Sequence, residues 1–262
     1  CIKARNSERN WRKKSKSKLI EIQHHKAHFS AILGEHQLFS EKVLGVIFDG
    51  TGYGDDANIW GGEFFDYEAN KMKRISHIAY FDWLLGDKMA KEPRLSLLSL
   101  ASDEMMAVLK GKFTQNELKT YQTLKNSNQL KTSSAGRLFD AVASLLNIAD
   151  YNTYEGEAAI LLENMICNYD LKSCRSYLSD PKNGISAKEI IKNIDVDLNN
   201  GTDKKTIIIN FLYTLAFSVI ELAKSNNYKH IAVSGGVFQN TTVVDVLRAV
   251  APKELILYFH HD

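Results

Sequence analysis

Two histidines and an aspartate near the start of the chain have the types and spacing of a metal site. His24 and His28 are four residues apart in the stretch from His24 to His36, where apolar residues recur at helical spacing. Residues four apart on a helix project from one side, so two imidazoles can reach one ion. Asp49 follows and can add a carboxylate, whereas His25 lies on a neighbouring face. The alternative is a chance pair of surface or packed histidines.

A glycine-rich turn follows this aspartate. The apolar run from Val43 to Phe48 predicts a strand that ends at Asp49 and opens into the turn Gly50, Thr51, Gly52, Tyr53, Gly54. Bare backbone N–H groups in such a turn can approach an anion closely. A second strand, Ile59 to Asp66, then forms a hairpin, which we interpret as the floor of a nucleotide site. Glycine-rich hairpins also occur in sheets that bind nothing.

A second glycine turn lies near the end of the chain. The predicted strand from His230 to Val233 leads into Ser234, Gly235 and Gly236, and the turn continues to Asn240. A strand, glycine turn and helix in succession can bring backbone N–H groups to a phosphate. We therefore expect this turn to supply the other half of the site.

Asp140 is a polar residue on an otherwise apolar helix. The helix begins after Ser133 or Ser134, and the carboxylate falls among its apolar positions. An unpaired carboxylate there would be costly, so Asp140 must have a partner. Two partners are open: a ribose hydroxyl, or a salt bridge to Arg137 or to a lysine elsewhere.

Three cations around Pro93 are a further candidate for phosphate contact. They are Lys88, Lys91 and Arg94, which precede or begin an apolar helix. Cations at a helix start can touch a substrate phosphate, and they are equally common as solvated surface.

The order of the elements predicts an α/β protein. Three strands are expected in succession, Val43 to Asp49, Ile59 to Asp66 and Lys73 to Phe81, before a mostly helical part. A long buried helix is expected from Thr206 to Asn226, and 168–203 reads as less regular. We divide the chain into a basic linker or tail (1–18), the remainder of an N-terminal lobe (19–130) and a second lobe (131–262).

Composition limits the partners. The 262 residues are 44% hydrophobic and 24% charged, with a formal net charge of +2, which gives no general case for nucleic acid or a membrane. Cys1, Cys167 and Cys174 form no CxxC pair, which fits a reducing, cytoplasmic setting. The apolar run from Ile207 to Leu222 is broken by polar residues and reads as a buried helix. The start at Cys1, without methionine, suggests a fragment.

Five segments together resemble the C-terminal part of the HypF family, the carbamoyltransferases of [NiFe]-hydrogenase maturation. The segments are QHHKAH, FDGTGYGDDANIWGGEFF, SSAGRLFDAVASLL, YEGEAA and SGGVFQN. The same superfamily includes TsaD, which makes threonylcarbamoyl-adenosine in tRNA. The resemblance implies a two-lobed actin, sugar-kinase and Hsp70-like (ASKHA) fold, with the N-terminal lobe incomplete here.

The resemblance also implies the chemistry and the roles of residues. Members of the family use a carbamoyl-adenylate, formed from carbamoyl phosphate and ATP, and pass the carbamoyl group to the C-terminal cysteine of the acceptor protein HypE. A divalent metal ion, zinc or iron, is implied at His24, His28 and Asp49. Phosphate is implied at Gly50, Thr51 and Gly52. The nucleoside is implied beside Asp140, Glu157, Gly235, Gly236 and Asn240.

The sequence departs from the whole family pattern at both ends. Acylphosphatase-like, zinc-finger and YrdC-like parts are absent from it, and the family pattern continues beyond Asp262 to a further aspartate ligand. Alternatives therefore stay open: an O-carbamoyltransferase, a relative of the tRNA threonylcarbamoyl transferases, or a non-catalytic fragment that binds nucleotide.

Overall fold

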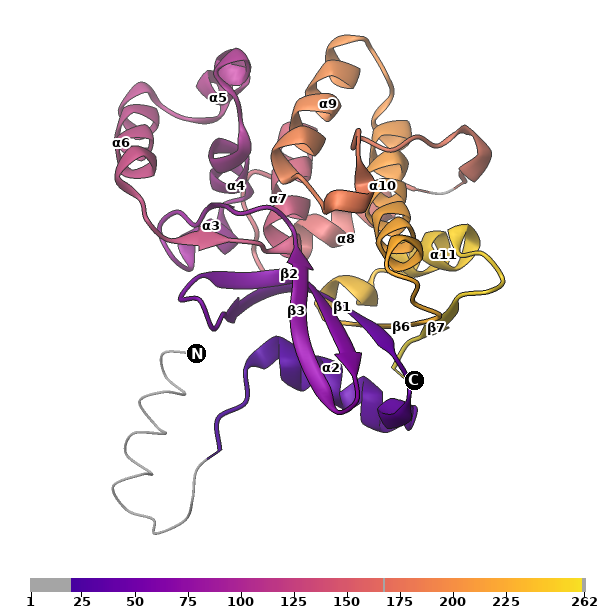
Figure 1. Ribbon diagram of the computed structural model, residues 1–262. Helices are drawn as coiled ribbons and strands as arrows, with labels where there is room; N and C mark the ends of the chain where they lie inside the picture. The colour runs from indigo at the N-terminus through magenta and orange to yellow at the C-terminus, as the bar shows by residue number, and fades with distance from the viewer. Residues whose placement is uncertain (1–19, 167, 261–262) are drawn as a thin grey trace.

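A mixed sheet forms the centre of the molecule, with helices on both faces (Figure 1). The computed structural model describes residues 20–166 and 168–260. The predicted linker, Cys1, Cys167 and Asp262 therefore lie outside the described residues. Helix α2 (His24–Glu35) packs against one face, and α7 (Ala135–Leu145) against the other.

The seven strands are ordered β4-β5-β2-β1-β6-β7, with β3 paired to β2. They are β1 (Val43–Tyr53), β2 (Ile59–Glu68), β3 (Lys71–His77), β4 (Phe81–Asp82), β5 (Lys131–Thr132), β6 (His230–Ser234) and β7 (Ile256–Tyr258). β1, β2 and β3 form an antiparallel meander, while β6 lies parallel to both β1 and β7. The third strand was predicted to reach Phe81, but β3 ends at His77 because the next residue, Ile78, bridges to Ile185 instead.

The other helices cover the opposite face of the sheet from α2 or extend beyond it (Figure 1). They are α3 (Lys88–Lys91), α4 (Pro93–Leu100), α5 (Met106–Lys112), α6 (Gln115–Ser127), α8 (Glu157–Asn164), α9 (Ala187–Asn199), α10 (Lys204–Ser225) and α11 (Thr241–Val250). The mostly helical part that was predicted after the three strands is confirmed by α3, α4, α5 and α6.

Helix α9 corrects the prediction that 168–203 is irregular. Ser186 caps it by accepting a hydrogen bond from the backbone N–H of Glu189, and Ile190, Ile191 and Ile194 are buried on one side. A serine followed three residues later by a glutamate is a helix-start pattern. The neighbouring proline and asparagines hid this signal.

Alternation along β1 decides which residues face α2. Val46 and Phe48 enter the large core on the α7 side, whereas Val43 and Ile47 enter a smaller core with Phe29 of α2. Because side chains alternate along a strand, Asp49 continues the series of Val43 and Ile47 and falls on the α2 side.

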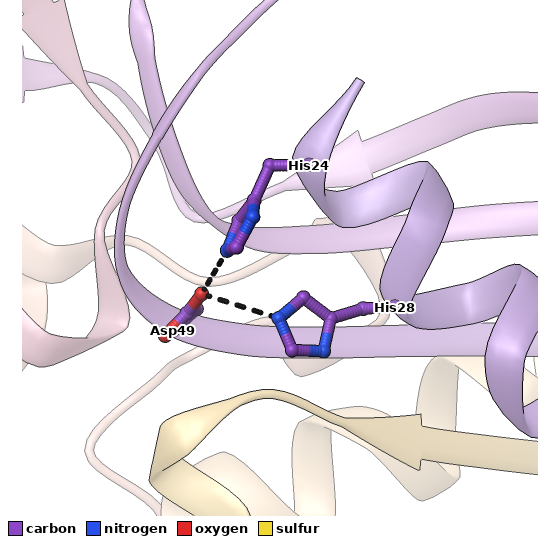
Figure 2. A group of neighbouring side chains, drawn as sticks. All are labelled: His24, His28 and Asp49. Carbon is purple, nitrogen blue, oxygen red and sulfur yellow. Dashed lines mark hydrogen bonds and ion pairs between the residues drawn. The ribbon is translucent and has the colours of Figure 1, made fainter. Parts of the chain in front are cut away.

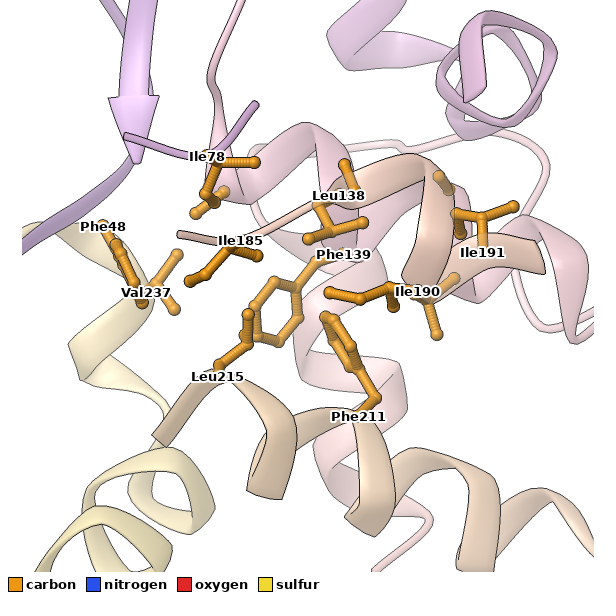
Figure 3. Packing of buried hydrophobic residues seen from close by; sticks show 14 of the residues in the cluster. Phe48, Ile78, Leu138, Phe139, Ile185, Ile190, Ile191, Phe211, Leu215 and Val237 are labelled. Carbon is orange, nitrogen blue, oxygen red and sulfur yellow. The ribbon is translucent and has the colours of Figure 1, made fainter. Parts of the chain in front are cut away.

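The large core is formed by the sheet, α7, α9 and α10 (Figure 3). Phe139 and Phe211 meet edge to face, with ring centroids 4.9 Å apart. Helix α10 is the helix among the described residues that is long and apolar enough to cross a membrane, and 78% of its most apolar window is buried inside the protein.

The predicted boundary at residue 130 runs through this sheet. β1 and β2 precede it, β6 and β7 follow it, and β1 pairs with β6 over five residues. The assignment of 19–130 and 131–262 to two lobes stays a prediction.

Candidate metal and nucleotide site

His24, His28 and Asp49 lie together where α2 passes the end of the regular part of β1 (Figure 2). His24 Nε2 is 2.8 Å from Asp49 Oδ2, and His28 Nε2 is 3.8 Å from the same oxygen. One ligand atom from each of the three residues lies within 4.8 Å of the other two. Within residues 20–166 and 168–260, this is the one group of three or more such residues.

A break in strand pairing shapes the backbone at Asp49. Phe48 pairs with Gly62 and Gly52 pairs with Trp60, so β1 carries extra residues between the two pairs. Such bulges turn side chains out of the regular pleat and are frequent beside active sites. Gly52 also leaves room for α2, since a Cβ there would lie 2.5 Å from His25 Cε1.

Hydrogen bonding keeps the carboxylate charged. Burial alone would raise the pKa of Asp49, but hydrogen bonds from His24 and the Gly50 N–H lower it to about 2. The same hydrogen bond to Asp49 raises the pKa of His24 above its usual value, while burial lowers the pKa of His28. The site therefore presents one carboxylate and two imidazoles in different electrostatic settings.

This donor set fits a divalent transition metal. Two imidazoles and one carboxylate occur in catalytic zinc sites and in ferrous iron sites, both of which keep positions open for water or substrate. His28 Nδ1 bonds to Ser234 Oγ at 3.0 Å, and such a bond on the second ring nitrogen is typical of metal-ligating histidines. The three residues would hold the ion, and their chemistry suits both zinc and iron.

His25 is separate from the triad, as its position on the helix predicted. Its side chain is fully buried, and burial lowers its pKa to about 3. Its Nδ1 accepts a hydrogen bond from Gln23 Nε2 at 2.9 Å. His25 is therefore a neutral packing residue between α2 and the hairpin.

Both predicted glycine turns meet at Asp49, but the first is not a separate turn as predicted, because β1 continues through Gly50 and Gly52 to Tyr53 with an interruption in its pairing. The carboxylate oxygen Oδ1 accepts from Gly50 N–H at 2.8 Å and from Gly236 N–H at 3.4 Å. Gly235 has φ +102°, and a Cβ there would lie 2.3 Å from the carbonyl oxygen of Phe48. Only glycine fits such a position without displacing backbone.

The N-terminus of α7 lies against the first turn. Ser134 caps α7 and its hydroxyl donates to the Gly50 carbonyl at 2.5 Å. A Cβ on Gly136 would be 3.0 Å from Gly50 Cα. The positive end of a helix dipole beside a glycine turn favours an anion. The sequence left the cap open between Ser133 and Ser134, and Ser134 is the residue that caps α7. Gly136 was not predicted in the site, and the small residues after the cap were the available signal.

Asp140 has the salt bridge that the sequence left open as one alternative. The side chain is buried, 2.6 Å from Arg137 Nε, and Oδ1 accepts from Asn152 at 3.1 Å. Burial raises the pKa of Asp140, and the charge of Arg137 opposes this effect. Both carboxylate oxygens therefore have protein partners, and a ribose contact stays a prediction.

Two other predicted nucleoside residues have local roles in the structure. Glu157 accepts hydrogen bonds from the backbone N–H and the hydroxyl of Thr153 at the start of α8. Asn240 caps α11, because its Oδ1 accepts from the Val243 N–H at 2.9 Å. The predicted phosphate residue Thr51 is exposed in the turn. These positions leave their ligand roles as predictions.

Of the three cations near Pro93, Arg94 is buried. Arg94 is 5% exposed and lies 2.9 Å from Glu92 and 3.0 Å from Glu117. The reading of Arg94 as solvated surface is therefore wrong. Lys88 Nζ donates to the Tyr121 hydroxyl at 2.7 Å.

The fold and the site define an α/β protein with a candidate metal centre between two glycine turns. The family model described as "Carbamoyltransferase, Kae1-like Domain, second subdomain" matches residues 45–262. The chain therefore belongs to the HypF carbamoyltransferase family. The resemblance and the α/β fold class inferred from the sequence are confirmed.

Curated relatives and solved structures agree with this assignment. The chain is 32% identical to carbamoyltransferase HypF of Synechocystis over 84% of its length and 31% of the relative's. It is 31% identical to probable carbamoyltransferase HypF of Methanocaldococcus jannaschii over 94% of its own length and 33% of the relative's. It thus spans about a third of the length of these relatives.

Two crystal structures share the fold at 28% sequence identity. Full-length HypF in a phosphate- and nucleotide-bound form matches with a TM-score of 0.80, covering 96% of this chain and 41% of that protein. HypF of T. kodakarensis matches with a TM-score of 0.79, and the match covers 93% of this chain and 34% of that protein.

Proposed function

We propose that this chain is a carbamoyltransferase domain that moves a carbamoyl group from carbamoyl-adenylate to the C-terminal cysteine of a HypE-like protein. The observation that carries the proposal is Asp49, whose two oxygens contact the metal-suited histidines and both glycine turns. Membership of the HypF family supports the reaction class, and a phosphate- and nucleotide-bound HypF relative supports the ligand class.

Each part of the site has a defined task in this reaction. A divalent cation, when bound, supplies Lewis-acid polarisation of a carbamoyl or phosphate oxygen. The backbone N–H groups of Thr51, Gly52 and Gly235 stabilise negative charge on the phosphate, because those of Gly50 and Gly236 donate to Asp49. Asp49 fixes both turns by accepting from Gly50 and Gly236, so the two sets of N–H donors are held at one place.

The transfer balances without a nucleophile from this chain. The acceptor thiolate attacks the carbamoyl carbon and forms a C–S bond, and the C–O bond to the adenylate phosphate breaks. The electron pair of that bond leaves with AMP, whose charge the turns stabilise. Cys174 is half-buried and burial raises its pKa, which disfavours it as a nucleophile.

The proposal includes ATP and carbamoyl phosphate as the sources of the adenylate, and a cytoplasmic location without nucleic acid or membrane partners. Asp140, Glu157 and Asn240 are proposed beside the nucleoside. These three side chains have protein partners in the structure.

The test supplies carbamoyl-adenylate, zinc or ferrous iron and a HypE-like acceptor to the chain. Mass spectrometry should find one added carbamoyl group on the acceptor's C-terminal cysteine, and none when that cysteine is replaced by serine. Transfer to a small-molecule hydroxyl or to tRNA would replace the proposal with one of its relatives. AMP binding without any transfer would indicate a nucleotide-binding fragment.

A further inference from the structure

A chain of hydrogen bonds leads away from the metal site on the side opposite Asp49. His28 Nδ1 is 3.0 Å from Ser234 Oγ, and Ser234 Oγ is 2.8 Å from His260 Nε2. His260 Nδ1 is 2.7 Å from Glu35 Oε2. The links join α2, the end of β6 and the segment after β7, so residues distant in sequence meet behind one candidate ligand.

The direction of these bonds follows from the groups themselves. An ionised carboxylate only accepts hydrogen bonds, so Glu35 requires the proton of His260 on Nδ1. Neutral His260 then offers Nε2 as an acceptor, and the single hydroxyl proton of Ser234 goes to it. Ser234 Oγ is left to accept, so His28 carries its proton on Nδ1. The lone pair of His28 therefore lies on Nε2, the atom that faces Asp49.

We propose that Ser234, supported by His260 and Glu35, is a positioning residue that holds His28 in the tautomer required to bind the metal. This inference rests on the metal site of the proposed function. The neutral side chain of a free histidine in water favours the proton on Nε2, which would block that ligand atom. Partners on the second nitrogen fix tautomer and ring orientation, and losing one typically lowers metal affinity about 10- to 100-fold.

Ser234 is well placed for this role because it is 2% exposed. Water therefore has little access to replace its hydroxyl. His260 has a side chain 44% exposed, so a substitution there disturbs the outer link while leaving the core packing in place.

The first test measures the tautomer without metal. Nitrogen NMR of the metal-free chain should show His28 protonated on Nδ1, and Ser234→Ala should shift the proton toward Nε2. Ser234→Thr keeps the hydroxyl and should restore the parent spectrum. A parent spectrum with the proton on Nε2, or a tautomer that Ser234→Ala leaves unchanged, would overturn the proposal.

The second test measures zinc affinity by competition with a chelator. Ser234→Ala should weaken binding about 10- to 100-fold, and His260→Phe should weaken it in the same direction. Ser96→Ala is the matched control, since Ser96 is equally buried and its hydroxyl has no partner among the described residues. Equal weakening in the control would contradict a specific role. A parent chain that binds no metal would count against the proposed function, while the tautomer measurement would still decide this inference.

Discussion

The backbone N–H of Gly236 donates to Oδ1 of Asp49 at 3.4 Å, although the two residues are 187 positions apart. The other carboxylate oxygen of Asp49 is 2.8 Å from His24 Nε2. One side chain thus joins the second glycine turn to the candidate metal ligands. A change in either turn should therefore be felt at the other and at the metal site.

Gly235→Ala should destabilise the fold by more than about 2 kcal/mol. The residue has a left-handed φ, and its new Cβ would lie 2.3 Å from the Phe48 carbonyl oxygen. Denaturant unfolding measures the loss. Gly111→Ala is the control, because a Cβ there meets nothing within 4 Å and should change stability by no more than about 1 kcal/mol. Equal stability of both variants would contradict the close approach of Gly235 to the Phe48 carbonyl oxygen.

Replacing the two candidate histidine ligands should remove bound metal. Elemental analysis of the purified parent should detect zinc or iron, and His24→Ala combined with His28→Ala should lower it to background, because a carboxylate alone binds such ions weakly. His77→Ala is the matched control, because His77 is a histidine outside the candidate triad. It lies in β3, where it pairs with Glu63 of β2, and its Nδ1 bonds to the carbonyl of Ile78. Metal content that is the same in all three proteins would exclude the triad.

Asn240 can be tested for two roles separately. Asn240→Ala should lower stability by about 1 kcal/mol through loss of the α11 cap. Asn240→Ser keeps a capping hydroxyl but removes the amide nitrogen, so it should retain stability and bind AMP about five- to tenfold more weakly if that nitrogen contacts the nucleoside. Calorimetry measures the affinity. AMP affinity unchanged in Asn240→Ser would limit the residue to capping.

Asp56 should contribute to acid sensitivity. Burial alone would raise its pKa, but hydrogen bonds from Tyr80, Asn58 N–H and Trp60 lower it to about 2. A carboxyl whose pKa is lower in the folded protein stabilises the fold at pH values above its ordinary pKa of 3.8. This stabilisation is lost as the pH falls toward 2.

The measurement is the free energy of unfolding between pH 5 and about pH 2. The free energy of unfolding of Asp56→Asn should fall less steeply with falling pH than that of the parent. The difference in slope should be less than about 1.4 kcal/mol per pH unit, because solvent screens this partly exposed group. Asp55→Asn removes a neighbouring surface ion pair with Lys26 and serves as control. Identical slopes for the parent and Asp56→Asn would refute this contribution.

Much of the site was readable from local sequence. Helical spacing placed His24 and His28 on one side of α2, as predicted. The strand was predicted to end at Asp49, but β1 continues to Tyr53, and its regular pairing is interrupted between Phe48 and Gly52. Alternation along a strand and repetition along a helix are local properties, so they survive in a single sequence. Both glycine segments were recognised from local sequence, although Gly50 and Gly52 lie within β1.

The supporting residues could not be found in this way. Ser234, His260 and Glu35 come from three separate elements and meet only after β6 and β7 pair beside α2. For Asp140 the need for a partner could be predicted, because a buried carboxylate requires one. The sequence alone did not decide whether that partner is Arg137 or a ligand.

The central claim is that Asp49 links the metal site to carbamoyl transfer, and Asp49→Asn tests it most directly. The asparagine keeps the size of the side chain and removes its charge. Labelled carbamoyl-adenylate is supplied with metal and acceptor, and label on the acceptor cysteine is measured by mass spectrometry. The parent chain should transfer the label, and Asp49→Asn should lower the transfer at least about 100-fold. Equal transfer by both proteins would contradict the central claim.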